Sequence, residues 1–274
     1  MRWLVIVLAV AVYACSGIKT TAGSLVQFRT TVGDMDVELF DQDKPVTVKN
    51  FLDYVNAGYY TNMIFHRWVP AFVVQGGGIY TAGRHTANPK LDYLPTFGPI
   101  TNEFNVGKFY SNLYGTLAMA KVGGDPNSAT SQWFFNLGNN SANLDSQNGG
   151  FTVFGRVVKG TNILNKFLNK TSGVLLYTNL SFPNELPVIK NPPGFEDLVY
   201  VDISILNVKV IKTNSVSQIS WNSVTGQTNL VEYTTSIPAV WQTLVTTNGN
   251  GASYLVKDTN PANPARFYRV RVVY

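Results

Sequence analysis

One arginine and one glutamine stand among apolar residues in the stretch 65–77, and both side chains are able to do chemistry. On a strand, alternate side chains point to opposite faces, so Arg67, Val69 and Ala71 share a face unless the intervening proline bends the chain. A buried arginine needs a polar partner. Gln75 is the nearest candidate, and because its carbonyl carries no charge, the guanidinium would stay free to act on a ligand. The alternative is a structural Arg67 paired with a carboxylate elsewhere in the chain.

Further blocks of sequence accompany this stretch. They mix aromatic and apolar residues with isolated polar ones, and they lie at 115–121, 127–135, 144–145 and 151–155. Together with 65–77, in order and spacing, they resemble the cyclophilin family of peptidyl-prolyl cis/trans isomerases. The resemblance runs from about Leu25 to about Val210, and the loop around 95–103 is more similar to bacterial members than to eukaryotic ones.

The resemblance implies a role for ten residues. Arg67 would donate a hydrogen bond to the prolyl nitrogen, and Gln75 would steady it. The proline ring would lie in a pocket lined by Phe72, Val73, Phe134, Leu144 and Phe151, while Gln132 would reach the peptide and the backbone of Ala120 and Lys121 would pair with the extended substrate. No cofactor is implied, because rotation about a peptide bond makes and breaks no covalent bond.

The energetics show what Arg67 would have to supply. Rotation about a peptide bond is opposed by about 18–20 kcal/mol, since the C–N bond has partial double-bond character. The lone pair of the amide nitrogen becomes available only as the bond twists, so a hydrogen bond to it is stronger in the transition state. Such a charged hydrogen bond is worth about 1.5–3 kcal/mol, whereas an acceleration of about 10⁵ needs about 7 kcal/mol. The remainder would come from holding the peptide still and excluding water.

Four positions depart from the family pattern. Val73 stands where methionine is frequent and Phe151 where histidine is frequent, and both keep the pocket apolar. Asn143 replaces the aromatic residue that usually closes the rim, which affects the expected substrate affinity and sensitivity to cyclosporin-type inhibitors. Lys121 replaces a frequent asparagine, but its expected contacts are made by the main chain.

Hydrophobic periodicity predicts the elements that carry these blocks. Alternating apolar residues on either side of a turn at 32–34 predict an antiparallel hairpin. A helix is predicted to open at Pro45 and Thr47 and to end at Gly58, and a short second helix is predicted for 162–169.

The later part of this domain has a loop and a closing strand. Prolines without periodicity at 171–197 predict an ordered loop, and alternation returns at 198–205. The fold class is mostly β, and the resemblance implies a closed eight-stranded antiparallel barrel with a helix over each end.

From Thr213 the composition shifts toward Thr, Asn, Ser and Val. Short alternating strands about ten residues apart, separated by turn residues, predict a small β-sandwich that resembles fibronectin-like modules of secreted bacterial proteins. We therefore predict a signal at 1–23, an isomerase domain at 24–212 and a small β domain at 213–274.

The N-terminus has the charged start and apolar run, 4–14, of a secretory signal. The run is too short to span a bilayer, and a buried N-terminal strand or helix is the alternative. Cys15 is the only cysteine, so the exported protein would hold no disulfide. The residues 12–15 resemble a lipoprotein processing box, so either Cys15 is lipidated and anchors the protein, or cleavage after Ala14 or near Ala22 gives a soluble form.

Composition and charge limit the kinds of binding partner that we expect for this chain. The chain is 45% hydrophobic and 14% charged, which excludes disorder over most of its length. The net charge of +5 comes from scattered residues without a basic run, so we expect no nucleic-acid partner. His66 would face away from Arg67, and because His85 is the other of the two histidines, we expect no metal site.

These observations predict an exported, cofactor-free prolyl isomerase, periplasmic or extracellular, that acts as a monomer on proline bonds of unfolded or extended polypeptides. A proline-peptide binding module with little turnover is the first alternative, motivated by Asn143. The second alternative is a surface or glycan-binding protein that acts through the C-terminal β domain.

Overall fold

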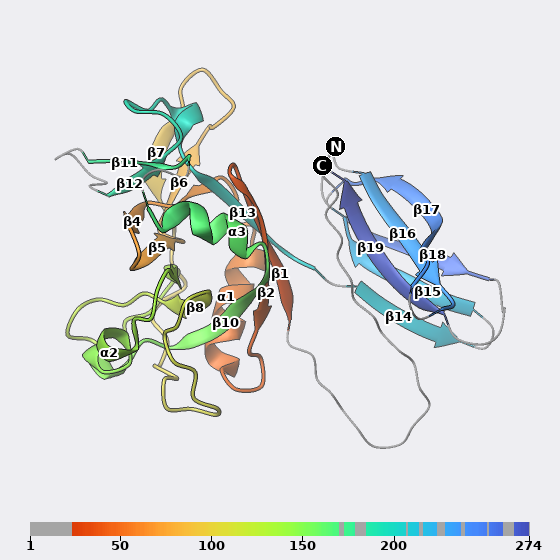
Figure 1. Cartoon of the computed structure of the whole chain (residues 1–274), viewed down its shortest axis with the longest axis horizontal. Coiled ribbons are helices and arrows are strands. Elements are labelled where there is room, and N and C mark those ends of the chain that lie inside the picture. The colour runs from red at the N-terminus through yellow and green to blue at the C-terminus, as the bar shows by residue number, and fades with distance from the viewer. Residues whose placement is uncertain are drawn as a thin grey trace. The chain divides into compact units, whose positions relative to one another are not determined.

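The computed structural model describes residues 24–169, 173–178, 185–206, 208–213, 216–223, 228–236, 239–250, 252–259 and 266–273. The predicted export signal, 1–23 with Cys15, lies outside these residues. The described chain divides into two compact units between Ile205 and Leu206 (Figure 1). The sequence placed this boundary after Lys212, but strand β14 (Val208–Thr213) pairs along its whole length with β15 (Val216–Asn222) of the second unit.

The first unit is mostly β. Its strands are β1 (Leu25–Thr30), β2 (Gly33–Leu39), β3 (Met63–Ile64), β4 (Arg67–Val69), β5 (Val73–Gly76), β6 (Ile79–Ala82), β7 (Lys90–Tyr93), β8 (Thr116–Met119), β9 (Trp133–Asn136), β10 (Val153–Lys159), β11 (Leu175–Tyr177), β12 (Leu186–Val188) and β13 (Tyr200–Ile205). Its helices are α1 (Pro45–Asn56), α2 (Ser141–Leu144) and α3 (Thr161–Leu164), with 3-10 turns η1 (Gln147–Gly149), η2 (Asn165–Phe167) and η3 (Phe195–Asp197).

Eleven of these strands form one antiparallel sheet in the order β4-β5-β9-β8-β10-β2-β1-β13-β3-β6-β7. Figure 1 shows that the sheet is curled. The predicted closure into an eight-stranded barrel is not confirmed, because this sheet is open and has β4 and β7 at its edges. The cause lies between β3 and β4. The N–H of Phe65 donates to Val199 and the N–H of His66 donates to Gln75, so the chain changes its pairing partner here instead of continuing as one strand.

The stretch predicted as a single strand at 65–77 is a hairpin. β4 ends at Val69, the chain turns through Ala71 with a φ of 58°, and β5 returns antiparallel to β4. The chain therefore does bend at Pro70 and Ala71, which is the exception allowed for in the single-strand prediction. Its consequence is that Gln75 lies directly opposite Arg67 on the neighbouring strand.

The predicted helix at residues 45–58 is confirmed as α1. Proline occupies its first turn, where the missing N–H costs no helical hydrogen bond. The Glu103 carboxylate accepts from the N–H groups of Val46 at 3.1 Å and Thr47 at 2.7 Å, so a residue distant in sequence satisfies the free N-terminal donors and suits the helix dipole. The second predicted helix is present as α3 followed by η2.

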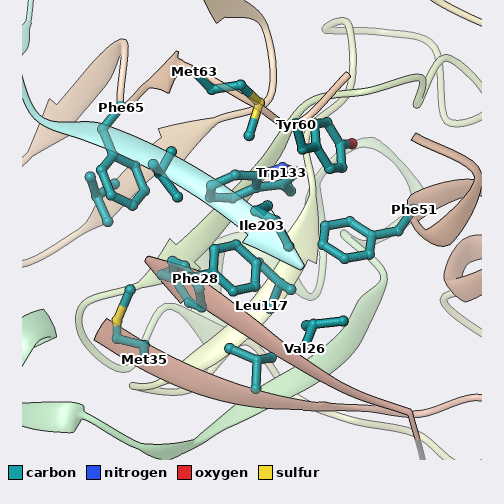
Figure 2. Close-up of a cluster of buried hydrophobic side chains, with 14 of the residues drawn as sticks. Val26, Phe28, Met35, Phe51, Tyr60, Met63, Phe65, Leu117, Trp133 and Ile203 are labelled. Atoms are coloured by element: carbon teal, nitrogen blue, oxygen red, sulfur yellow. The ribbon is translucent and has the colours of Figure 1, made fainter. Parts of the chain in front are cut away.

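Trp133 of β9 lies at the centre of the main hydrophobic core (Figure 2). Its ring is fully buried and meets the rings of Phe28 at 5.0 Å and Phe65 at 5.7 Å edge to face. Phe51 of α1 packs on Phe28, whereas Phe167 of η2 packs on Phe65, so the two helical segments cover different parts of one core. Because each buried aromatic ring contributes about 1.5–3 kcal/mol, this core fixes β9 firmly.

The predicted loop at 171–197 contains an antiparallel hairpin, β11 and β12, in its described residues. Leu186 and Val188 of β12 are buried and pack with Leu198 and Tyr200. The sequence missed this hairpin because Pro187 stands within β12.

The second unit consists of two three-stranded antiparallel sheets in its described residues, with the orders β14-β15-β18 and β17-β16-β19. Its further strands are β16 (Thr228–Thr234), β17 (Gln242–Asn248), β18 (Ser253–Asp258) and β19 (Phe267–Val273). Ile219 and Trp221 of one sheet form a single buried cluster with Val231, Tyr268 and Val270 of the other. The predicted β-sandwich is therefore present.

Within the described part of the chain, no helix has both the length and the apolar character that crossing a membrane requires.

Candidate functional site

Four neighbouring strands place the predicted catalytic residues in one row. Arg67 of β4 lies opposite Gln75 of β5, Gln75 opposite Phe134 of β9, and Phe134 opposite Ala118 of β8. Directly opposed residues in antiparallel strands send their side chains to the same face. Strands lie about 4.8 Å apart, so about 10 Å separates the backbones at Arg67 and Phe134, which an extended segment of three residues spans.

The row one residue further along belongs to the opposite face. Trp68, Val74, Phe135 and Leu117 are paired in the same manner, and all four are fully buried in the main core. This packing fixes the backbone of the four strands. The side chains of the Arg67 row are therefore presented from a rigid support.

The predicted pocket residues come together in one apolar cluster outside the main core, which we call the site cluster. Among its members, Phe134 meets Phe151 edge to face with 5.9 Å between ring centroids. The site cluster comprises Val73, Ala118, Phe134, Leu144 and Val153, with Phe40, Phe72, Tyr110, Ala120 and Phe151 partly buried against it. It thus contains all five predicted pocket residues and Ala120.

The sequence missed some members of this cluster. Tyr110 stacks on Phe40 at 3.9 Å, and its hydroxyl donates to Asp43 at 2.6 Å. Burial, followed by the bond to Asp43, raises the pKa of Tyr110 to about 12, so its hydroxyl stays protonated at neutral pH. Tyr110 lies in a long loop without periodicity, and no local pattern indicates its position.

Gln75 and Gln132 form a polar pair beside the site cluster. The Gln75 amide nitrogen donates to the Gln132 carbonyl oxygen at 2.7 Å. Burial lowers the pKa of His66 to about 4, so its ring is neutral at neutral pH. The Gln75–Gln132 hydrogen bond holds the two amides together, and Gln75 therefore has Gln132 as a side-chain partner.

Arg67 differs from the prediction. Its side chain is 41% exposed rather than buried, and its Nε lies 2.8 Å from a carboxylate oxygen of Glu185. The expectation of an arginine without a carboxylate partner is therefore wrong, because a carboxylate from a distant part of the chain contacts the guanidinium. The reason is that Glu185, just before β12, forms a parallel bridge with Arg67.

The pair with Glu185 leaves the cation able to act. Both side chains are more than a third exposed, and an ion pair of this kind contributes only about 0–1 kcal/mol. A guanidinium has five N–H donors, of which the Nε–H is one. Arg67 can therefore donate to a peptide lying along the row while Glu185 stays in place.

Lys121 uses its side chain as well as its main chain. Its Nζ donates to the carbonyl oxygens of Asn148 and Gly150, each at 2.7 Å, and lies 4.7 Å from the centre of the Phe151 ring. Burial lowers the pKa of Lys121 to about 8. This side chain ties the loop that carries Phe151 to the strand end beside β8.

Two other predicted positions behave differently. The N–H of Ala120 donates to the carbonyl of Gln132 at 2.9 Å, so this group is not available to pair with a peptide. Asn143 is exposed on α2, immediately before the buried Leu144. The rim beside Leu144 is therefore polar.

Known proteins match the first unit. The family model described as cyclophilin-type peptidyl-prolyl cis-trans isomerase matches residues 25–180. The peptidyl-prolyl cis-trans isomerase of Acinetobacter baylyi is 39% identical over 149 residues, covering 54% of this chain and 73% of that protein. Peptidyl-prolyl cis-trans isomerase A of Dickeya dadantii is 41% identical over 164 residues, covering 58% and 80%. Peptidyl-prolyl cis-trans isomerase B of Escherichia coli is 39% identical over 153 residues, covering 54% and 87%.

Among solved structures, a cyclophilin-type peptidyl-prolyl cis-trans isomerase of Cryptosporidium parvum covers 67% of this chain and 98% of its own, at 26% identity and a TM-score of 0.47. The family match ends before the second unit begins. It covers more than half of the chain, and the bacterial relatives are matched over more than two thirds of their own lengths. The resemblance of the sequence blocks is thereby confirmed, and the chain belongs to the cyclophilin-type peptidyl-prolyl cis/trans isomerases.

Proposed function

We propose that Arg67 and the site cluster carry the isomerase activity of this chain, and that its substrates are X-Pro bonds in extended segments of unfolded or newly translocated proteins. The observation that supports this most is the row from Arg67 through Gln75 to Phe134 on one face of β4, β5 and β9. It sets a cationic donor beside an apolar surface at the spacing of a short extended peptide.

The two ends of the row have different tasks. The site cluster takes the proline ring, and burying three ring methylenes at about 0.8 kcal/mol each gives about 2 kcal/mol. Because the ring stays buried in both isomers and in the twisted form, this contact selects proline without accelerating rotation. Acceleration is the task of Arg67, which donates to the prolyl nitrogen as its lone pair becomes available.

The polar pair Gln75–Gln132 supports both ends. It lies between Arg67 and the site cluster, and its mutual hydrogen bond of 2.7 Å holds the two amides in place. A substrate held at a carbonyl by one amide and at its ring by the site cluster has less freedom on both sides of the X-Pro bond, while rotation about that bond stays possible. Restricting the other motions lowers the entropic part of the barrier.

The role in protein export rests on the N-terminal sequence. The charged start and the apolar run at 4–14 support translocation out of the cytoplasm. Cell fractionation of the full chain, with and without the Cys15→Ser change, tests this. Export of both proteins, with fatty-acid labelling of the wild type alone, would favour the lipid-anchored form over the soluble one.

A protease-coupled assay on an X-Pro peptide tests the enzymatic proposal for this chain. We expect the cis-to-trans rate to rise in proportion to protein concentration above the spontaneous rate. We also expect the protein to shorten the proline-limited phase of refolding of a denatured protein. Peptide binding in a titration without any acceleration would contradict the proposal.

That contradictory outcome would favour the binding-module alternative, for which the exposed Asn143 is the motivating observation. The Asn143→Trp variant addresses it directly. Because position 143 is exposed on α2, a larger ring fits without disturbing the core, and we expect KM to fall a few-fold with kcat unchanged.

A further inference from the structure

Glu185 contacts Arg67 from a part of the chain that the family match does not reach. The match ends at residue 180, and Glu185 follows it at the start of the segment that leads into β12. Its carboxylate lies 2.8 Å from the Arg67 Nε. The contact therefore joins Arg67 of the proposed site to a segment that lies beyond the family match.

The backbone of Glu185 is fixed independently of this ion pair. Its carbonyl accepts from the N–H of Trp68 at 2.6 Å, and Trp68 is fully buried with its indole N–H bonded to Phe167. On the other side, the buried Leu186 continues into the hairpin with β11. Glu185 thus extends the sheet beyond the edge strand β4 and presents its carboxylate from ordered backbone.

Gln75 does not need to fill the role that the sequence gave it. Its amide nitrogen is engaged with Gln132 at 2.7 Å, while Glu185 approaches Arg67 directly. Both members of the Arg67–Glu185 pair are more than a third exposed, so the pair adds little to folding stability. Its effect falls instead on the orientation of the guanidinium.

We propose that Glu185 is a positioning residue for catalysis: it holds Arg67 by the Nε side so that the outer guanidinium nitrogens point along the row toward Gln75 and Phe134. This inference rests on the proposed catalytic role of Arg67. An arginine with a half-exposed side chain samples many rotamers, and a fixed carboxylate removes that freedom before the substrate binds. This orientation lowers the activation free energy, because the donor already points at the prolyl nitrogen when the transition state forms.

The test compares two changes at one position in the full-length protein. Glu185→Ala removes the acceptor, and we expect kcat for an X-Pro peptide to fall about 3–10-fold with KM within about twofold of the wild type. Glu185→Gln keeps a carbonyl acceptor in the same place, and we expect it to retain at least half of the wild-type kcat. Glu196→Ala, which removes an exposed carboxylate in η3 of the same segment, is the matched control and should leave kcat unchanged.

A double-mutant comparison separates this inference from the proposed function. In an Arg67→Ala background, Glu185→Ala should have no further effect on kcat. An equal loss in both backgrounds, an unchanged kcat in Glu185→Ala, or a kcat that rises because the carboxylate had weakened the cation would each overturn the positioning role. If Arg67→Ala itself matches the wild type, the proposed role of Arg67 fails, and that result is recognised without any Glu185 variant.

Discussion

The two faces of β4, β5, β9 and β8 share one backbone but differ in the clusters that their side chains join. On the inner face, the row of Trp68, Val74, Phe135 and Leu117 is fully buried. The outer row begins with the half-exposed Arg67 and ends in the site cluster. A shift of one residue along a strand moves a side chain from one face to the other. In these strands, the residues of one face therefore stabilise the core, and the alternate residues on the other face form the proposed site.

The adjacent pair Phe134 and Phe135 shows this division within one residue type. Both rings are buried, at 4% and 0% exposure, but Phe135 packs on Phe28 in the main core while Phe134 packs on Phe151 in the site cluster. The same substitution can therefore be made at both positions, and we expect it to affect stability at Phe135 and kinetics at Phe134.

The largest expected effect is on stability. We expect Phe135→Ala to lower the free energy of unfolding by about 3–5 kcal/mol, as is usual for deleting a buried aromatic ring. Urea unfolding measures it. For the molecules that remain folded, kcat/KM should stay close to the wild-type value, whereas Phe134→Ala should lower kcat/KM. A greater kinetic loss in Phe135→Ala than in Phe134→Ala would break the division between the faces.

The next effect concerns pH and the buried residue next to Arg67. Burial lowers the pKa of His66 to about 4 from 6.5, so between these pH values the unfolded chain binds a proton that the folded chain does not. The contribution of His66 to stability should therefore fall as pH falls through this window, by about 2 kcal/mol between pH 7 and pH 5. Urea unfolding at both pH values measures the change.

The controls for this experiment are the two histidine variants. His66→Gln should remove its share of the pH dependence, whereas His85→Gln, at an exposed position, should keep the wild-type dependence. Burial also raises the pKa of Asp34 to about 6, which acts in the opposite sense over the same window, so the difference between variants is the informative quantity. An identical pH dependence in wild type and His66→Gln would contradict the account.

The smallest expected effect is on substrate binding at the face that carries the site cluster, and it concerns Lys121. Lys121→Met removes the two hydrogen bonds, each of 2.7 Å, that tie the 148–150 loop beside Phe151. We expect KM to rise about 2–10-fold with kcat unchanged, because the lost contacts, worth about 0.5–1.5 kcal/mol each, hold a binding surface and not the reacting bond. Steady-state kinetics measures this, with Lys49→Met, on the exposed side of α1, as the matched control. A fall in kcat at constant KM would place Lys121 nearer the reaction than we infer.

Much of the site could be predicted from the sequence because its signals are local or follow from family resemblance. Alternation marked the β1–β2 hairpin, helical spacing with a proline start marked α1, and the apolar residues of the predicted pocket do form one cluster. The sequence order of these blocks was sufficient to recognise the family.

What the sequence did not predict depends on contacts between distant segments. Nothing near Arg67 indicates Glu185, because the carboxylate arrives through a hairpin whose proline hides its alternation. The pairing change at Phe65 and His66, which leaves the sheet open, depends equally on distant backbone partners. The boundary between the units was misplaced because β14 alternates as a strand of either unit would.

The most direct test of the proposed role of Arg67 compares kcat/KM for an X-Pro peptide between Arg67→Ala and the wild type in a protease-coupled assay. A charged hydrogen bond worth about 1.5–3 kcal/mol in the transition state predicts a loss of about 10–150-fold. Because Arg67 is half exposed, the thermal unfolding midpoint should stay within a few degrees of the wild type. Equal kcat/KM values for the two proteins would contradict the proposal that this guanidinium stabilises the twisted peptide bond.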